Sequence, residues 1–375
     1  MQYRTFEKTN EKFSLLGMGT MRLPLLHDGT VDEAKSISMI RKAIDEGINY
    51  VDTAYMYHDG DSEKILGKAL KDGYRDKVFL ADKMPVWLAK DEEDMKALFQ
   101  EQLDRLDVDI IDMYLIHNIN VGSWKLIKKY NALKFLDELK AEGKIKHIGF
   151  SFHDELPLFK EAIDAYPWDF CQIQLNYMDQ EMQAGTAGLK YAKDKGLPVI
   201  VMEPLKGGLL TDALPDAINS LWEKAPIKRT PAEWAFRWVS NLPGVLTVLS
   251  GMSTIHQLDE NLQIFSQAKV GSLTSAELSI IDQVANEYNR LIKYACTECN
   301  YCMPCPHKID IPSTIRFYNN WFLYGGNPKL KDDYPVWIAK GHRASDCTGC
   351  KACTLNCPQH LPIYDIMKKT AKLYE

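Results

Sequence analysis

Short apolar stretches alternate with amphipathic segments along the first two thirds of the chain. Runs rich in apolar and β-branched residues predict seven strands: 48–52, 77–83, 110–117, 144–151, 169–175, 197–203 and 245–250. An eighth strand is expected between Leu15 and Leu23, where the run contains two glycines. Apolar residues recur at helical spacing over 32–46, 91–106 and 124–142, which predicts amphipathic helices between the strands.

This alternation predicts an α/β fold with a parallel sheet covered by helices. Eight strand–helix units over this length fit a closed (β/α)8 TIM barrel, which usually takes about 250 residues. A doubly wound open sheet is the alternative, and its first turn usually reads G-x-G-x-x-G. Here Gly17-Met18-Gly19-Thr20-Met21-Arg22 lacks the third glycine, so the barrel is favoured.

A capping box at Thr274–Glu277 predicts a further helix that continues to about Leu291 and leads to the first of a group of cysteines. We therefore expect a barrel over residues 1–270 and a second domain, which begins with this helix, over residues 271–375.

Eight of the nine cysteines lie in this second domain, in two runs that each end in Cys-Pro. Three cysteines at i, i+3 and i+6 hold one [4Fe-4S] cluster, and the cysteine before the proline reaches the neighbouring cluster. The spacing predicts two clusters, the first on Cys296, Cys299, Cys302 and Cys357, and the second on Cys347, Cys350, Cys353 and Cys305. The two runs resemble the two-[4Fe-4S] bacterial ferredoxin module.

Structural zinc is the alternative interpretation of the cysteines. Zinc sites usually combine two separated Cys pairs and leave no role for a third cysteine three residues on. The remaining cysteine, Cys171, lies on a predicted strand and is expected to be a small buried apolar residue.

Four polar residues fall at or just after strand ends, where a barrel places its catalytic groups. They are Asp52, Tyr57, Lys83 and His117. Tyr57 could protonate a carbonyl oxygen that receives a hydride, with Lys83 lowering the pKa of the phenol and Asp52 holding Lys83 charged. His117 could donate a second hydrogen bond to the same oxygen.

These residues occur in D-T-A-x-x-Y followed by S-E-x-x-L-G-x-A-L, a strand-ending lysine and an L-I-H strand end. Residues 12 to 265 thereby resemble the aldo-keto reductase superfamily, and the cysteine-rich end resembles its branch with a C-terminal ferredoxin-like domain. The resemblance implies a (β/α)8 barrel, NADPH-dependent carbonyl reduction and a catalytic tetrad in which Tyr57 is the acid.

The resemblance also implies contacts to a nicotinamide nucleotide. Ser151 and Gln172 match residues that hold the carboxamide, Met202 stands at the position of an aromatic stacking partner, and Asn261 matches an adenine contact. Phe152 replaces the family's asparagine. Lys206 and Gly207 could approach the pyrophosphate.

The usual clamp for a 2′-phosphate is missing. Where the family places a basic residue, the chain reads Ser250-Gly251-Met252-Ser253, and Gln257 stands where an arginine is common. NADP(H), NAD(H) and the absence of any nicotinamide nucleotide therefore all stay open. A flavin is an option without support, because no flavin fingerprint stands out.

The charge and the hydropathy of the chain limit the kinds of partner that it is expected to bind. The chain has 45 basic and 51 acidic residues, a net charge of −6, and so has no global attraction to nucleic acid or to an anionic membrane. No apolar run approaches the roughly 20 residues that span a bilayer, and no signal peptide is seen, so we expect a cytoplasmic protein. The expected substrate is a small-molecule carbonyl compound, with Trp87 and Trp124 as candidate pocket walls.

Three functional hypotheses follow. The first is an oxidoreductase that reduces a carbonyl or related group in the barrel and exchanges electrons through its clusters with ferredoxin or another carrier. The second is an ordinary NAD(P)H carbonyl reductase with purely structural clusters. The third is a non-catalytic electron-transfer or regulatory subunit.

Overall fold

The computed structural model describes residues 1–375, which form two compact units. The first unit consists of Met1–Pro204 and Ala232–Leu273, and the second of Leu205–Pro231 and Thr274–Glu375. The segment 205–231 is thus an excursion from the first unit that packs with the C-terminal part of the chain.

Eight parallel strands close into a barrel in the first unit, as predicted. Their order around the barrel is β10-β3-β4-β5-β6-β7-β8-β9. The strands are β3 (Leu16–Gly19), β4 (Tyr50–Asp52), β5 (Phe79–Met84), β6 (Ile111–Ile119), β7 (Ile145–Phe152), β8 (Phe170–Gln174), β9 (Val199–Met202) and β10 (Val245–Gly251). Each predicted strand has a counterpart, and the closed order excludes the open sheet.

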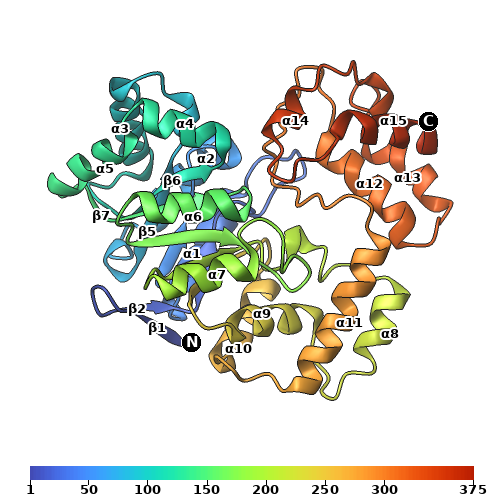
Figure 1. Cartoon of the computed structure of the whole chain (residues 1–375), viewed down its shortest axis with the longest axis horizontal. Coiled ribbons are helices and arrows are strands. Elements are labelled where there is room, and N and C mark those ends of the chain that lie inside the picture. The colour runs from blue at the N-terminus through green and yellow to red at the C-terminus, as the bar shows by residue number, and fades with distance from the viewer. The chain divides into compact units, whose positions relative to one another are not determined.

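Helices surround this barrel (Figure 1). They are α1 (Glu33–Asp45), α2 (Asp61–Ala69), α3 (Glu92–Leu106), α4 (Val121–Lys129), α5 (Ala132–Ala141), α6 (Leu156–Ala165), α7 (Gly185–Asp194), α9 (Pro231–Asn241) and α10 (Ile255–Gln267). The single helix expected over 124–142 is wrong. The chain forms α4 and α5 there, because Asn131 adopts a left-handed conformation with φ of 53° that breaks the helix.

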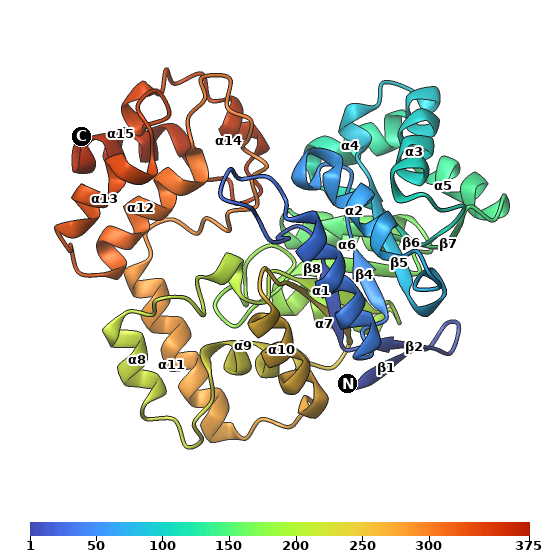
Figure 2. The same ribbon diagram turned by 180° about the vertical axis from the view of Figure 1, so that it is seen from behind.

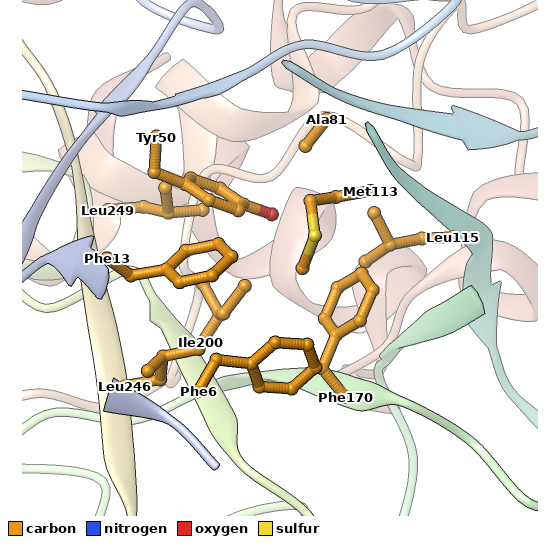
Figure 3. Packing of buried hydrophobic residues seen from close by; sticks show 10 residues of the cluster. All are labelled: Phe6, Phe13, Tyr50, Ala81, Met113, Leu115, Phe170, Ile200, Leu246 and Leu249. Atoms are coloured by element: carbon orange, nitrogen blue, oxygen red, sulfur yellow. The ribbon is translucent and has the colours of Figure 1, made fainter. Parts of the chain in front are cut away.

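An antiparallel hairpin of β1 (Tyr3–Phe6) and β2 (Glu11–Ser14) packs at the N-terminal ends of the barrel strands. Figure 3 shows Phe6 and Phe13 facing Phe170, Ile200 and Leu246. The hairpin was not predicted from sequence. It closes the end of the barrel opposite to the catalytic residues with apolar side chains.

The second unit is helical (Figure 2). Its helices are α8 (Asp216–Trp222), α11 (Ser275–Leu291), α12 (Ile311–Leu323), α13 (Lys329–Trp337), α14 (Ala352–Asn356) and α15 (Ile363–Tyr374). The predicted capping box begins α11, where the side chain of Thr274 accepts from the Glu277 N–H and Glu277 accepts from Thr274. Isoleucines of α12 and α15 form an apolar core on which six of the cysteines pack. No helix of the chain is long and apolar enough to cross a membrane.

Candidate functional site

The four predicted catalytic residues come together at the C-terminal end of the barrel. β4 and β5 are neighbours, and β5 pairs with β6, so Asp52, Lys83 and His117 extend from three adjacent strands. The ammonium of Lys83 lies 2.6 Å from Oδ1 of Asp52 and donates to the Thr53 carbonyl oxygen at 2.6 Å. The side chains of Lys83 and Asp52 are only 1% and 4% exposed, so this is a buried ion pair.

Tyr57 joins this pair from the turn after β4. Nζ of Lys83 lies 5.0 Å from the centre of the Tyr57 ring. The rings of Tyr57 and His117 meet edge to face, with centroids 6.4 Å apart. The phenol, the ammonium and the imidazole therefore border one region, as the sequence predicts.

The pKa shifts give these groups distinct protonation states. Burial alone would lower the pKa of Lys83, but the charges of Asp52 and Tyr57 outweigh it and raise the pKa. Burial lowers the pKa of His117 well below its usual value, and Lys83 and His153 act in the same direction. At neutral pH the lysine is an ammonium and the histidine is neutral.

The pKa of Tyr57 is raised. Burial raises it above the usual value of 10, while the charge of Lys83 opposes the rise and Asp52 adds to it. The expected effect of Lys83 is present, but the net lowering predicted from sequence is wrong, because burial is the larger cause. Tyr57 is therefore held in the protonated form that an acid needs.

A strained turn holds Tyr57. The three residues that follow it have positive φ: His58 at 51°, Asp59 at 54° and Gly60 at 91°. Left-handed conformations of non-glycine residues cost free energy and persist where the surroundings impose them. Here Nε2 of His58 accepts from the Leu23 N–H at 3.2 Å, and a Cβ at Gly60 would lie 2.9 Å from the Arg105 guanidinium.

The S-E motif after this turn has a structural role. The hydroxyl of Ser62 lies 2.9 Å from Thr53 Oγ1 and 2.6 Å from Thr20 Oγ1. The buried carboxylate of Glu63 lies 2.8 Å from Arg105. The contacts of Ser62 join α2 to the ends of β3 and β4, and the contact of Glu63 joins α2 to α3.

The predicted carboxamide residues lie close to the same ion pair. Nε2 of Gln172 donates to Oδ2 of Asp52 at 3.1 Å, and its buried Oε1 accepts no hydrogen bond. The hydroxyl of Ser151 accepts from the Asn118 N–H at 2.8 Å, so its own proton is available to another acceptor. An unpaired acceptor beside a hydroxyl donor fits the amide of a nicotinamide ring.

The other predicted nucleotide contacts are more dispersed. Met202 ends β9 and is partly buried against the barrel core, and Asn261 donates to Ser250 Oγ at 3.0 Å after β10. Lys206 and Gly207 belong to the second unit, where the charge of the buried Lys206 acts on Cys296. A pyrophosphate contact for these two residues stays a prediction.

Two neighbours of the tetrad were missed from sequence. His153 follows β7, is buried, and has a pKa of about 4, because burial outweighs its hydrogen bond with Gln183. The charge of Glu203, after β9, raises the pKa of Tyr57. Both lie at or just beyond a predicted strand end, which is the signal that could have identified them.

The two tryptophans expected at the mouth behave differently. The centre of the Trp87 ring lies 5.1 Å from that of the His117 ring, so Trp87 borders the predicted catalytic residues. Trp124 is 4% exposed within α4 and donates its ring N–H to Glu161 at 2.7 Å. Cys171 is fully buried in β8, and burial raises the pKa of its thiol.

The eight cysteines of the second unit surround two cavities. Cys296, Cys299, Cys302 and Cys357 line one of them, and Cys305, Cys347, Cys350 and Cys353 line the other. These are the two groups predicted from spacing, including the exchange of Cys305 and Cys357. The side chain of Ile363 lines both cavities and so lies between them.

Two of these thiols are buried and would lose their protons only to a bound metal. Burial raises the pKa of Cys296 and of Cys302 to about 12, so both are protonated when no cation lies between them. Iron binds thiolates and displaces such protons. Four sulfur atoms around an otherwise largely apolar cavity fit the ligand set of one [4Fe-4S] cluster.

We predict that Lys83→Met destabilises the protein by about 3–5 kcal/mol, because it leaves the Asp52 carboxylate buried without its counter-charge. Anaerobic urea unfolding followed by circular dichroism measures this loss. Adding Asp52→Asn should restore part of it.

Lys64→Met is the matched control, since Lys64 pairs with Asp61 on the exposed face of α2 and such pairs contribute about 1 kcal/mol at most. If Lys83→Met were as stable as this control, the buried ion pair would contribute no more to the free energy of unfolding than an exposed one, which would contradict the prediction.

Comparisons with known proteins show the family of the chain. The sequence profile of the Aldo/keto reductase family matches residues 15–286, and that of a 4Fe-4S dicluster domain matches residues 295–361. The aldo-keto reductase YhdN of Bacillus subtilis is 28% identical over 77% of this chain and 97% of its own. The NADH-specific methylglyoxal reductase of Escherichia coli is 27% identical over 75% of this chain and 98% of its own.

A solved structure has the same barrel. An aldo-keto reductase from Klebsiella pneumoniae in complex with NADPH superposes with a TM-score of 0.62 and is 26% identical over 76% of this chain and 96% of its own. The family profile covers more than half of the chain, and the eight-stranded barrel carries the tetrad at its mouth. The chain belongs to the aldo/keto reductase family of oxidoreductases and carries a C-terminal 4Fe-4S dicluster domain.

Proposed function

We propose that the barrel reduces an aldehyde or ketone group of a small molecule with NAD(P)H, and that Tyr57 is the proton donor. The observation that carries this proposal is the meeting of Tyr57, Lys83 and His117 beside the buried Asp52 carboxylate. The named activity of the Escherichia coli relative, methylglyoxal reduction, supports a small carbonyl substrate.

The protonation states assign a role to each side chain. Bound NAD(P)H supplies the hydride that the carbonyl carbon accepts. Tyr57 gives its proton to the carbonyl oxygen, which completes the alcohol, and the ammonium of Lys83 stabilises the phenolate that remains. Neutral His117 donates one N–H to the same oxygen and orients the substrate. Asp52 keeps Lys83 charged within a buried site.

We further propose that each cysteine group holds one [4Fe-4S] cluster and that the clusters exchange electrons with ferredoxin or a similar carrier in the cytosol. Such clusters transfer single electrons, so a hydride can feed them only through a converter such as a flavin, which takes both electrons and the proton and passes the electrons on one at a time. Cys350 is the exposed member of its group, and Lys351 beside it is exposed as well. This arrangement supports electron exchange at the surface through the group that contains Cys350.

A second candidate has its own support. The cysteines pack against the same apolar core that joins α12 and α15, so the clusters would also brace the second unit. If this were their only role, the barrel would be an ordinary NAD(P)H carbonyl reductase. A non-catalytic subunit is disfavoured, because such a protein has no physical need for a complete tetrad with a buried ion pair.

Tyr57→Phe should lower kcat for carbonyl reduction by about a hundredfold to ten-thousandfold, the usual contribution of a positioned acid. Binding of NADPH should change little. In the wild type, kcat should stay level from about pH 6 to pH 9 and fall only above pH 10, where Tyr57 loses its proton. No inflection should appear near pH 6.5, because the lowered pKa keeps His117 neutral there.

Steady-state rates with methylglyoxal across this pH range measure both effects. Phe152→Tyr, which adds a phenol outside the tetrad, is not expected to restore activity to Tyr57→Phe. Full activity of Tyr57→Phe in protein that retains its clusters would contradict the assignment of the acid.

Cys357→Ser should alter the cluster held by Cys296, Cys299 and Cys302, although Cys357 is close in sequence to the other group. Cys305→Ser should alter the opposite cluster. Mössbauer and EPR spectra of each variant identify the altered cluster, against about eight irons in the wild type. Cys171→Ser is the control and should change neither. An effect of Cys357→Ser confined to the cluster of Cys347, Cys350 and Cys353 would contradict the exchange.

A further inference from the structure

The end of β10 lacks the cation that the family places there. Gly251 and the residues beside it in sequence carry no charge. Gln257, at the position where the family commonly has an arginine, already forms hydrogen bonds within the protein. Its Oε1 accepts from the N–H groups of Ser253 at 2.8 Å and Thr254 at 3.2 Å, which closes the N-terminus of α10. Neither position offers a charge to a 2′-phosphate.

The loop after β3 brings an arginine to this place. β3 and β10 are adjacent, and Gly19 lies opposite Gly251 in their register. The Ser253 hydroxyl donates to the Arg22 carbonyl oxygen at 2.9 Å, which fixes the two loops against each other. A Cβ at Gly251 would lie 3.2 Å from Cβ, 3.5 Å from Cγ and 3.7 Å from Cδ of Arg22. The Arg22 side chain therefore runs through the space that a side chain at position 251 would need.

The guanidinium of Arg22 is not used by the protein. Of the ten arginines in the chain, the other nine donate to carboxylate, hydroxyl or carbonyl oxygens. Arg22 forms no ion pair and donates no side-chain hydrogen bond, although it is half-buried. A partly desolvated guanidinium without a counter-charge is suited to bind an anion.

We propose that Arg22 replaces the missing basic residue and binds the 2′-phosphate of NADPH, which makes the barrel selective for NADPH over NADH. This inference rests on the proposed use of a nicotinamide nucleotide. Asn261, the expected adenine contact, is buried and donates to Ser250 next to Gly251, so the adenosine end of the nucleotide would lie at the same strand end. The planar guanidinium can donate two parallel hydrogen bonds to the 2′-phosphate of NADPH. NADH has no 2′-phosphate.

Calorimetric titration of the cluster-loaded protein with NADPH, NADH and 2′,5′-ADP under anaerobic conditions tests this proposal. Arg22→Gln should weaken NADPH and 2′,5′-ADP about tenfold to a hundredfold, the usual range for a charge-assisted phosphate contact, and change NADH less than about twofold. Arg41→Gln is the control: Arg41 lies on α1 and pairs with Asp72, so this change removes an equal charge away from the proposed site. It should leave the affinities for NADPH, NADH and 2′,5′-ADP unchanged.

A second variant separates the phosphate contact from loop distortion. The double variant Arg22→Ala, Gly251→Lys removes the Arg22 side chain that would crowd a residue at position 251 and places a lysine at the end of β10 instead. The selectivity for NADPH over NADH should then return. Equal binding of NADH and NADPH by the wild type, or unchanged selectivity in Arg22→Gln, would overturn the role of Arg22 and leave carbonyl reduction intact. Failure of both nucleotides to bind cluster-loaded wild-type protein would overturn the proposed cofactor, and the inference with it.

Discussion

The buried ion pair between Lys83 and Asp52 is the interaction on which the catalytic site depends. Two charges are stable in an apolar interior only when each satisfies the other with good geometry. Adjacent parallel strands provide that geometry, because Asp52 at the end of β4 lies opposite Ala81, and Lys83 follows two residues further along β5 on the same face. Gln172 then donates to the free oxygen of Asp52, and Tyr57 borders the ammonium. Closure of the barrel thus brings together the groups on which the proposed acid role of Tyr57 depends.

Strand ends explain why much of the site could be predicted. Apolar strands are visible as local runs, and a parallel barrel places all their carboxyl ends at one mouth, so Asp52, Lys83 and His117 could be identified without coordinates. The net pKa of Tyr57 could not, since it depends on burial by residues distant in sequence. The strands β1 and β2 mix polar and apolar residues, so neither stands out as an apolar run. Arg22 lies beside Gly251 through strand pairing that no local spacing reveals.

In the cysteine-rich unit, too, some features could be predicted from the sequence and others could not. Spacing within each run was enough to group the cysteines, because three residues at i, i+3 and i+6 can only surround a nearby point. The structure places them around two cavities with Ile363 between. The packing of segment 205–231 with this unit could not be foreseen, because its signals are those of a barrel loop. Within this unit the charge of Lys206 acts on Cys296, a predicted cluster ligand.

The chain is proposed to combine a hydride site with two single-electron sites, and an anaerobic titration with NADPH tests that proposal most directly. Cluster absorbance in the visible region is followed while iron, sulfide and flavin are counted on the same sample. We expect NADPH to bleach the clusters of the wild type and to bleach them far less in Arg22→Gln at the same concentration. Unchanged absorbance in protein whose clusters dithionite does reduce would contradict it and leave the clusters as structural elements.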